Sequence, residues 1–353
     1  MSRMTPQLQA AAQKALLAFG KDEATLLPIA MGHINATFEV RHPSGAFVLQ
    51  RVNPMFAPEV NLDIVAIVEH LHRAQLVAPD LQRAHDGRFW HQDDTGGIWR
   101  LMTKIEGHAV ERCTTPAQCH TVGALLGRFH RALWGVEHAF AAPRLGVHDT
   151  ARHLARLKAA LGEHSGHAAY DQVAPLAQAI LAAGERLPPL GVGPERIVHG
   201  DPKISNFIFN GQGQAIALID LDTLANMPLA LEVGDALRSW CSPGGEDPRA
   251  AGFVLSHFEA AMHGYREGVG ERLTPQEVQH LVPALGAIAT ELAARFACDA
   301  LEERYFGWDR GRFAHAWQHN LERAQSQWLL AQSFAAQKHQ AARVVEQVFG
   351  LTA

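Results

Sequence analysis

The segment IVHGDPKISNFIFNGQGQAIALIDLDT, which covers residues 197–223, decides the fold prediction for the whole chain. Its first half places four polar side chains in the spacing H-x-D-x-K-x-x-N: His199, Asp201, Lys203 and Asn206. Its second half contains two short apolar runs, residues 207–210 and 215–219, on either side of the glycine-containing segment 211–214. Such a pattern predicts a β-hairpin.

The residues after this hairpin supply further carboxylates. Folding the hairpin at its turn brings Asp220 almost opposite Asn206, whereas Asp222 falls further along the chain. Asp220 is therefore the better metal ligand. A hard cation such as Mg²⁺ binds one or two carboxylates together with the phosphates of a nucleotide, which this arrangement would provide.

The spacing of the polar residues is typical of a kinase catalytic loop. Phosphoryl transfer requires positioned charges and a group that accepts the proton of the attacking hydroxyl. We predict that Asp201 accepts this proton, that Lys203 places a positive charge on the transferred phosphate, and that Asn206 offers an oxygen to Mg²⁺. The alternative is a plain turn in which the histidine and the aspartate satisfy each other. A second H-x-D match, at residues 91–93, lacks the asparagine and the later aspartates.

Composition limits the class of protein. The 353 residues suffice for two lobes with a sizeable core, and 47% hydrophobic with 19% charged residues is typical of a globular protein. The net charge of -5 gives no electrostatic footprint for nucleic acid and argues against binding to an anionic membrane surface. Four widely spaced cysteines fit a reducing compartment. No signal peptide and no uninterrupted apolar run of membrane-spanning length is found, so we expect a cytoplasmic protein.

The N-terminal part of the chain predicts a second hairpin. Residues 31–40 and 46–52 have strand character around a Pro-Ser-Gly turn. Its opening lies where a kinase fold covers the nucleotide phosphates, and we assign four contacts to it: Gly32, His33, Asn35 and Thr37. The G-x-G-x-x-G pattern is absent, so an ordinary hairpin with a polar entrance is the alternative.

A kinase fold also expects a cation on the next strand. Gln50 and Arg51 occupy this place, and because successive strand residues face opposite sides, only one of them can point at the nucleotide. The sequence leaves both open, and it also allows Arg51 to be a solvated residue. Glu59 and Glu69 on a predicted helix are candidate partners for the cation or plain surface charges.

Further along, the chain is predicted to be mainly helical. The segment from Thr103 to Gly107 is interpreted as a connector between two lobes, where backbone groups could hydrogen-bond an adenine, and Met102 just before it is assigned to nucleotide binding. Helices are predicted over residues 6–20, 59–76 and 115–135 from apolar residues spaced by three and four.

Three residues are expected to orient the groups that contact the nucleotide rather than to touch it: His199, Asp222 and Asp235. For Asp235 the sequence supports two compatible interpretations. It precedes the apolar run that starts at Ala236, so it is placed to cap a helix. A buried aspartate at this point would also fix the backbone of the catalytic loop.

The last third of the chain carries another polar cluster. Glu291, Arg295 and Asp299 follow one another at intervals of four residues and therefore share one helix face. Such pairs are common on solvated helix faces. The functional alternative is that this face closes an acceptor pocket and binds substrate hydroxyls.

Several short motifs occur in a fixed order: G-H-I-N-A-T-F at 32–38, L-Q-R at 49–51, H-G-D and its asparagine at 199–206, I-D-L-D-T at 219–223 and G-D at 234–235. In this order they resemble the aminoglycoside phosphotransferase and choline kinase superfamily, and within it the bacterial N-acetylhexosamine 1-kinases. The Gln50-Arg51 pair departs from the lysine that the superfamily more often carries.

The resemblance implies an α+β, two-lobed protein-kinase-like fold. Residues 1–103 would form a small antiparallel-sheet N-lobe, and residues 104–353 a larger, mainly helical C-lobe. It further implies ATP and Mg²⁺, with phosphorylation of the anomeric hydroxyl of an N-acetylated hexose. Choline, an amino alcohol, homoserine or an aminoglycoside are the alternative acceptors, and an inactive kinase fold that serves as a binding module is a third reading.

Overall fold

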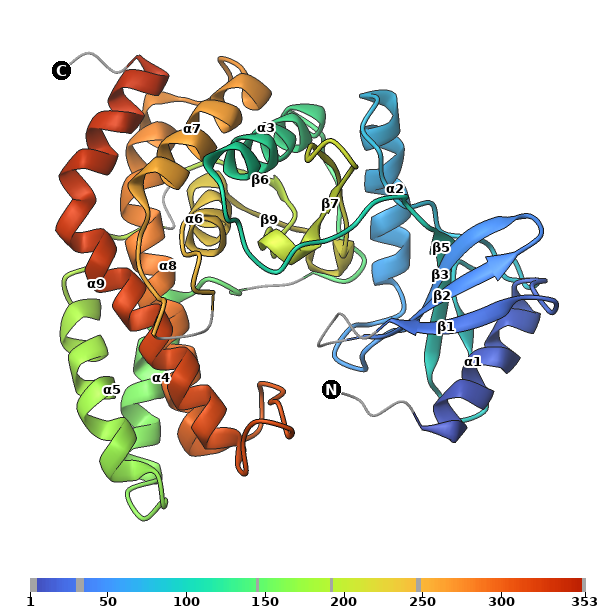
Figure 1. Ribbon diagram of the computed structural model, residues 1–353, viewed down its shortest axis with the longest axis horizontal. Coiled ribbons are helices and arrows are strands. Elements are labelled where there is room, and N and C mark those ends of the chain that lie inside the picture. Colours follow the sequence, from blue (N-terminus) through green and yellow to red (C-terminus); the bar gives the residue numbers. More distant parts are fainter. Residues whose placement is uncertain (1–4, 30–34, 144–145, 191–192, 246–248, 351–353) are drawn as a thin grey trace. The chain divides into compact units, whose positions relative to one another are not determined.

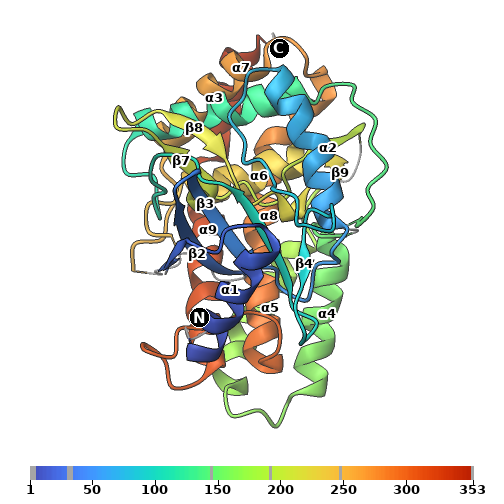
Figure 2. The same ribbon diagram turned by 90° about the vertical axis from the view of Figure 1, so that its right-hand side faces the viewer.

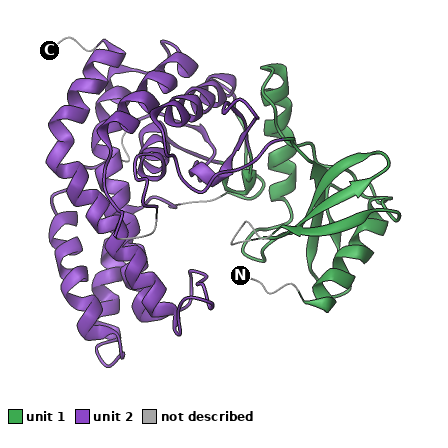
Figure 3. Cartoon of the chain, viewed as in Figure 1, with its two compact units in different colours: residues 1–106, 137–143, 219–224 green, residues 107–136, 144–218, 225–353 purple. Residues whose placement is uncertain are grey.

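The computed structural model describes residues 5–29, 35–143, 146–190, 193–245 and 249–350. The chain forms two compact units (Figure 3). The first unit contains residues 1–106 and two later segments, 137–143 and 219–224, and the second contains residues 107–136, 144–218 and 225–353. The segment that carries Asp220 and Asp222 therefore belongs to the first unit.

The first unit is built on an antiparallel 5-stranded sheet with the order β1-β2-β3-β5-β4 (Figure 1). Its helices are α1 and α2, and its elements are α1 (Pro6–Ala18), β1 (Thr25–Ile29), β2 (Ala36–His42), β3 (Gly45–Arg51), α2 (Val60–Arg73), β4 (His91–Gln92), β5 (Ile98–Thr103) and the 3₁₀ turn η2 (Leu221–Thr223). The predicted hairpin is confirmed, because β2 and β3 pair from Ala36 opposite Arg51 to His42 opposite Gly45. The predicted helices over residues 6–20 and 59–76 are confirmed as α1 and α2.

Alternating side chains of the sheet and one face of α1 form the core of this unit. Phe38 and Val40 are fully buried on one face of β2, two residues apart, and pack with Leu49 of β3 and Leu16 of α1. This spacing follows from the two-residue period of a strand.

Asp63 ties the segment of residues 137–143 to α2. Its carboxylate accepts hydrogen bonds from the backbone N–H groups of Ala141 and Ala142 at 2.8 and 3.0 Å, and it lies 2.8 Å from Nε2 of His138. Glu59 and Glu69, the predicted partners of a strand cation, are exposed on the same helix, and Glu69 pairs with Arg73.

Asp93, the aspartate of the second H-x-D match, organises the turn between β4 and β5. It accepts hydrogen bonds from Nε1 of Trp99 at 2.8 Å and from the N–H groups of Thr95 and Gly97 at 2.9 and 2.8 Å. Burial would raise the pKa of Asp93, but these donors outweigh it and lower the pKa to about 2. This copy of the motif therefore has a structural explanation.

The second unit is mainly helical. Its elements are α3 (Pro116–Ala132), α4 (Thr150–Glu163), α5 (Tyr170–Gly184), β6 (Glu195–Val198), η1 (Ile204–Asn206), β7 (Phe207–Phe209), β8 (Ala215–Leu218), β9 (Ala225–Pro228), α6 (Leu229–Trp240), α7 (Leu255–Val269), α8 (Pro275–Glu302) and α9 (Ala316–Phe349). β7 pairs with β8 in the predicted hairpin, and β6 pairs with β9. α3 and α7 lie side by side in both Figure 1 and Figure 2.

Glycines allow α3 and α7 to approach closely. A Cβ atom added to Gly264 of α7 would lie 2.0 Å from the carbonyl oxygen of His120 on α3, and the same kind of clash would occur at Gly123, Gly127 and Gly268. The two backbones therefore touch where side chains would otherwise separate them.

α8 forms the centre of the unit. Its 28 residues are long and apolar enough to cross a membrane by length and composition alone, although the sequence contains no uninterrupted apolar run of that length. However, 78% of its apolar 18-residue window is buried inside the protein, so this helix packs as a core helix. The four cysteines are also buried, and they are free thiols.

Candidate active site

The loop after β6 brings the predicted catalytic residues together. Nζ of Lys203 lies 2.5 Å from Oδ2 of Asp201, and Nδ2 of Asn206 donates to the backbone carbonyl of Asp201 at 2.8 Å. The loop turns at Gly200, whose φ of +83° favours glycine, and ends in the 3₁₀ turn η1. The Asn206 amide contacts Asp201 twice through its nitrogen, and Oδ1 is the atom suited to a hard cation.

Glu232 of α6 holds the start of this loop and was not predicted from the sequence. Its side chain is 0% exposed, and its two oxygens accept the backbone N–H groups of His199 at 2.9 Å and Gly200 at 2.8 Å. The only sequence signal was a glutamate inside an otherwise apolar helical run. Glu232 therefore fixes the backbone at the start of the predicted catalytic loop, and the orienting role that the sequence suggests for Asp235 stays a prediction.

α6 also contacts the later part of the loop. Trp240 donates through Nε1 to the carbonyl of Pro202 at 3.0 Å, and the hydroxyl of Ser239 accepts the N–H of Ile204 at 3.0 Å. One helix thus fixes the loop on both sides of Asp201.

The prediction that Asp235 caps a helix is wrong. α6 begins at Leu229, so Asp235 lies inside the helix, where it accepts a hydrogen bond from Nε of Arg238 at 2.8 Å. Burial would raise the pKa of Asp235, but the charges of Arg238, His148 and Lys203 outweigh it and lower the pKa. Asp235 is therefore ionised and interacts electrostatically with Lys203.

The aspartates of the predicted metal loop, Asp220 and Asp222, lie in the first unit. Asp220 has φ 67° and ψ 54°, a left-handed conformation that is uncommon for a residue other than glycine. Asp222 is 2% exposed and forms an ion pair with Arg100 of β5, which is 1% exposed. Arg100 was not predicted, because nothing in the local pattern of β5 distinguishes it from a surface arginine.

The residues predicted to bind the nucleotide have different surroundings. Gly32 and His33 lie outside the described residues. Asn35 donates to Asp222 at 2.8 Å, and the hydroxyl of Thr37 accepts from Nε2 of Gln50 at 3.3 Å. These side chains form one polar network with Arg100.

Gln50 and Arg51 point in opposite directions. Gln50 pairs opposite Arg100 in the sheet and accepts from its guanidinium, whereas Arg51 lies beside Thr95 at 3.4 Å and over the ring of Trp99 at 6.0 Å. Met102 lies in β5 opposite Val48 of β3.

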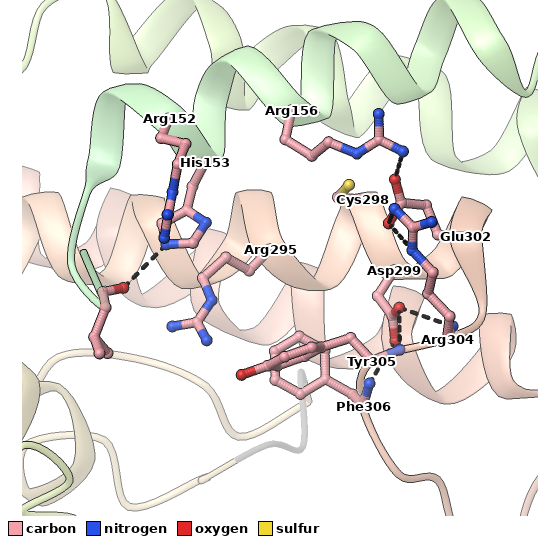
Figure 4. A pocket seen from close by; sticks show the side chains of 11 residues that line it. Arg152, His153, Arg156, Arg295, Cys298, Asp299, Glu302, Arg304, Tyr305 and Phe306 are labelled. Atoms are coloured by element: carbon pink, nitrogen blue, oxygen red, sulfur yellow. Dashed lines mark hydrogen bonds and ion pairs between the residues drawn. The ribbon is translucent and has the colours of Figure 1, made fainter. Parts of the chain in front are cut away.

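A cavity of about 520 Å³ lies in the second unit between α4 and the C-terminal part of α8 (Figure 4). Four arginines, two aromatic rings and two carboxylates are among its lining residues: Arg152, Arg156, Arg295, Arg304, Tyr305, Phe306, Asp299 and Glu302. Figure 4 shows Arg295 pointing towards the space between His153 and Tyr305. Arg295 and Asp299 of the predicted acceptor cluster are thus brought together in one cavity.

The carboxylates around the cavity are already bound by the protein. Asp299 accepts three backbone N–H groups of residues 304–306 at 2.8–3.1 Å and the amide of Asn320 at 2.9 Å. Glu302 pairs with Arg156 and Arg304. Asp299 therefore shapes the turn after α8, and its carboxylate has little capacity left for a ligand.

Glu291, the third member of the predicted cluster, is 1% exposed and is not among the cavity-lining residues. It accepts from Nδ1 of His148 at 3.1 Å and from the hydroxyl of Thr150 at 2.6 Å. Burial would lower the pKa of His148, but its hydrogen bond with Glu291 outweighs this and raises the pKa. The pair anchors the start of α4 to α8.

Arg295 is a cavity cation that lies beside two aromatic rings. Within the described residues its guanidinium has one ion-pair contact, with Glu291 at 3.9 Å, and it lies 5.8 and 5.7 Å from the ring centres of Tyr305 and Phe306. A guanidinium carries five N–H donors, so Arg295 can donate hydrogen bonds to a ligand in the cavity.

An antiparallel-sheet unit and a helical unit with an H-x-D-x-K-x-x-N loop define a protein-kinase-like fold, and solved structures share it. The microcompartment-associated aminopropanol kinase is 17% identical with a TM-score of 0.63, over 94% of this chain and 98% of that one. Amicoumacin kinase in complex with AMP-PNP, Ca²⁺ and Ami is 15% identical with a TM-score of 0.59, over 99% and 97% of the two chains. A choline/ethanolamine kinase family protein from Mesorhizobium loti is 17% identical with a TM-score of 0.53, over 98% and 99%.

The model of the phosphotransferase enzyme family matches residues 25–268, and the chain belongs to this family. The predicted superfamily and fold class are therefore confirmed. The protein is a small-molecule phosphotransferase with a hydroxyl group as acceptor.

Proposed function

We propose that this phosphotransferase transfers the γ-phosphoryl group of ATP to a sugar hydroxyl, and specifically to the anomeric hydroxyl of an N-acetylhexosamine. The observation that carries the transfer chemistry is the contact of Asp201 with Lys203 and Asn206 in one loop. The sugar acceptor is inferred from the motif resemblance and from the cavity beside α8.

In the proposed reaction Asp201 accepts the proton of the attacking hydroxyl. The hydroxyl oxygen forms a bond to the γ-phosphorus, and the bond from this phosphorus to the β–γ bridging oxygen breaks, which releases ADP. Lys203, whose ammonium lies beside Asp201, stabilises the charge on the transferred group.

Asn206 and Asp220 would hold Mg²⁺ in this proposal. Both offer oxygen atoms, the ligands that a hard cation prefers. Bound there, Mg²⁺ would neutralise negative charge on the nucleotide phosphates. The amicoumacin kinase structure, which contains AMP-PNP and Ca²⁺, supports a nucleotide and a divalent metal in this fold.

The cavity favours a neutral, oxygen-rich acceptor over a cationic one. A cationic amino alcohol or aminoglycoside requires free carboxylates or an aromatic cage. Here Asp299 and Glu302 are already bound by the protein, and guanidinium groups line the space. The donors of Arg295 and the exposed ring of Tyr305, which is 57% exposed, suit the hydroxyl and acetamido groups and the apolar face of a sugar.

A screen for ADP release discriminates between the acceptors. The purified protein is incubated with ATP and Mg²⁺ and either N-acetylglucosamine, N-acetylgalactosamine, choline, homoserine or an aminoglycoside. We expect ADP release with the N-acetylhexosamines. Release with only choline, homoserine or the aminoglycoside would refute the sugar assignment, and tight nucleotide binding without release for any acceptor would favour a binding module.

Replacing Asp201 with asparagine tests the catalytic role. The substitution keeps the size of the side chain but removes its ability to accept a proton, and general base assistance is worth about 10²- to 10⁴-fold. We expect turnover to fall by at least that lower factor while nucleotide affinity stays near the wild-type value. Wild-type turnover in this variant would exclude Asp201 as the base.

A further inference from the structure

Arg100 is a fully buried arginine whose charge is directed at the metal loop. Its side chain lies in β5, and Nη1 and Nη2 both donate to the carboxylate of Asp222, the Nη2 bond measuring 3.0 Å. Nε and Nη2 also donate to Oε1 of Gln50 at 3.0 and 2.6 Å. This bidentate geometry fixes the orientation of both groups.

The same carboxylate is held from its other side. Asn35 donates through Nδ2 to Oδ2 of Asp222 at 2.8 Å, while its own Oδ1 accepts the backbone N–H of Asn53 at 2.8 Å. Asp222 is therefore bound by a strand cation and by an amide that is itself fixed, and all of these residues belong to the first unit.

The backbone next to Asp222 adopts an unfavourable conformation. Asp220, two residues earlier, has φ 67° and ψ 54°, and η2 begins at the next residue. Aspartate tolerates this left-handed region better than most non-glycine residues, and its surroundings offset the remaining cost. The buried network at Asp222 is one anchor of this short segment.

A buried ion pair does not by itself imply added stability, because desolvation of both charges offsets their attraction. The pair can instead serve to fix the geometry of the groups that it joins. Gln50 pairs opposite Arg100 in the sheet, and its amide oxygen accepts from the Arg100 guanidinium, which orients the guanidinium towards Asp222. The strand cation of this protein thus binds the metal loop through Asp222.

We propose that Arg100 is a positioning residue, which acts through Asp222 to hold residues 219–224 in the conformation that presents Asp220 to Mg²⁺. The inference rests on the metal role that the proposed function gives to Asp220. In the same proposal, Gln50 orients the side chain of Arg100 and Asn35 orients the side chain of Asp222.

The test uses Arg100→Met, Asp222→Asn and the double variant. Arg88→Met is the matched control, since Arg88 forms an exposed arginine–aspartate pair with Asp86 in the same unit. For each protein the Mg²⁺ concentration that gives half-maximal ATP binding is measured by calorimetry, together with the affinity for ATP without metal and the free energy of unfolding in urea.

We expect both single variants to require about 10- to 100-fold more Mg²⁺, the range typical of residues that orient a metal ligand, with metal-free ATP affinity within about 2-fold of wild type. The double variant should be no worse than the single ones, because both remove the same interaction. The Arg88 variant should match wild type. If Arg100→Met does not fold, Arg100→Lys keeps the charge, loses the bidentate geometry and should shift the Mg²⁺ requirement in the same direction.

Two results would overturn the inference, and they differ. A wild-type protein that binds ATP without any dependence on Mg²⁺ would refute the metal role of Asp220 and this inference with it. A Mg²⁺-dependent wild type whose Arg100 and Asp222 variants keep its Mg²⁺ requirement, even if they are less stable, would refute the positioning role alone.

Discussion

Replacing Glu232 with glutamine separates the architecture of the catalytic loop from its chemistry, because Glu232 lies behind the loop and is 0% exposed. Its two carboxylate oxygens accept the N–H groups of His199 and Gly200 at 2.9 and 2.8 Å. Glutamine keeps one acceptor oxygen and places an NH₂ group against the other N–H. One hydrogen bond is therefore lost, and a buried donor is left facing another donor.

The expected cost follows from these two contacts. A hydrogen bond to a charged group contributes about 1.5–3 kcal/mol, and an unsatisfied buried donor costs about 1–3 kcal/mol. A neutral glutamine is easier to bury than a carboxylate, which offsets part of this loss. We therefore expect the free energy of unfolding to fall by about 2–4 kcal/mol. Gly200 directly precedes Asp201, so loss of its hydrogen bond can displace the proposed base. A displacement of about 1 Å at a catalytic group can reduce turnover about 10²-fold.

Urea unfolding and steady-state ADP release measure the two effects on the same preparations. Glu267→Gln is the control, because Glu267 is a glutamate of the same unit whose side chain is 70% exposed and whose ion pair with His120 should contribute at most about 1 kcal/mol. If Glu232→Gln changes neither the unfolding free energy nor turnover by more than the control does, the two hydrogen bonds do not hold the loop.

Two further predictions concern the helical unit. Glu291 raises the pKa of His148 in the folded protein above its ordinary value of 6.5, so the stabilisation from this pair is complete below pH 6.5 and is lost as the pH rises through the folded-state pKa. Urea unfolding at pH 6, 7 and 8 should therefore show a fall in the unfolding free energy of at most about 1.4 kcal/mol per pH unit, and this fall should be absent in His148→Gln. Equal pH dependence in both proteins would contradict the pairing. Gly264→Ala should destabilise the protein by about 1–3 kcal/mol or more, because its Cβ would lie 2.0 Å from the His120 carbonyl oxygen. Gly162→Ala in α4, whose added Cβ meets nothing within 4 Å, should instead stabilise the protein by about 0.5–1 kcal/mol. If urea unfolding gives both substitutions the same sign, α3 and α7 do not pack closely.

Local sequence patterns were sufficient where the chain's own neighbours determine the structure. The hairpin of β7 and β8 follows from two apolar runs around a glycine-containing turn, and the loop that contains Asp201, Lys203 and Asn206 spans only six residues. Groups this close in sequence have few ways to separate, so their contacts could be predicted from spacing alone.

Long-range partners could not be predicted in this way. Arg100 and Asp222 are separated by 122 residues, and Glu232 is separated from Gly200 by 32. Each of these residues looks locally like an ordinary charged position. The start of α6 was misplaced because its N-cap, Pro228, makes no side-chain hydrogen bond, so the sequence lacked the usual signal and Asp235 was assigned that role instead.

Both acids of the predicted acceptor cluster are already bound by other groups of the protein. Glu291 binds His148 and Thr150, and Asp299 binds a backbone turn, so neither acid of the predicted acceptor cluster is available to neutralise a ligand's positive charge. Arg295 retains its donors beside the cavity, with a single ion-pair contact at 3.9 Å within the described residues. A ligand that enters this cavity must therefore bring hydrogen-bond acceptors and must not bring an uncompensated cation, since burying a like charge beside a guanidinium carries an electrostatic cost. These conditions support the proposed sugar acceptor over an amino alcohol.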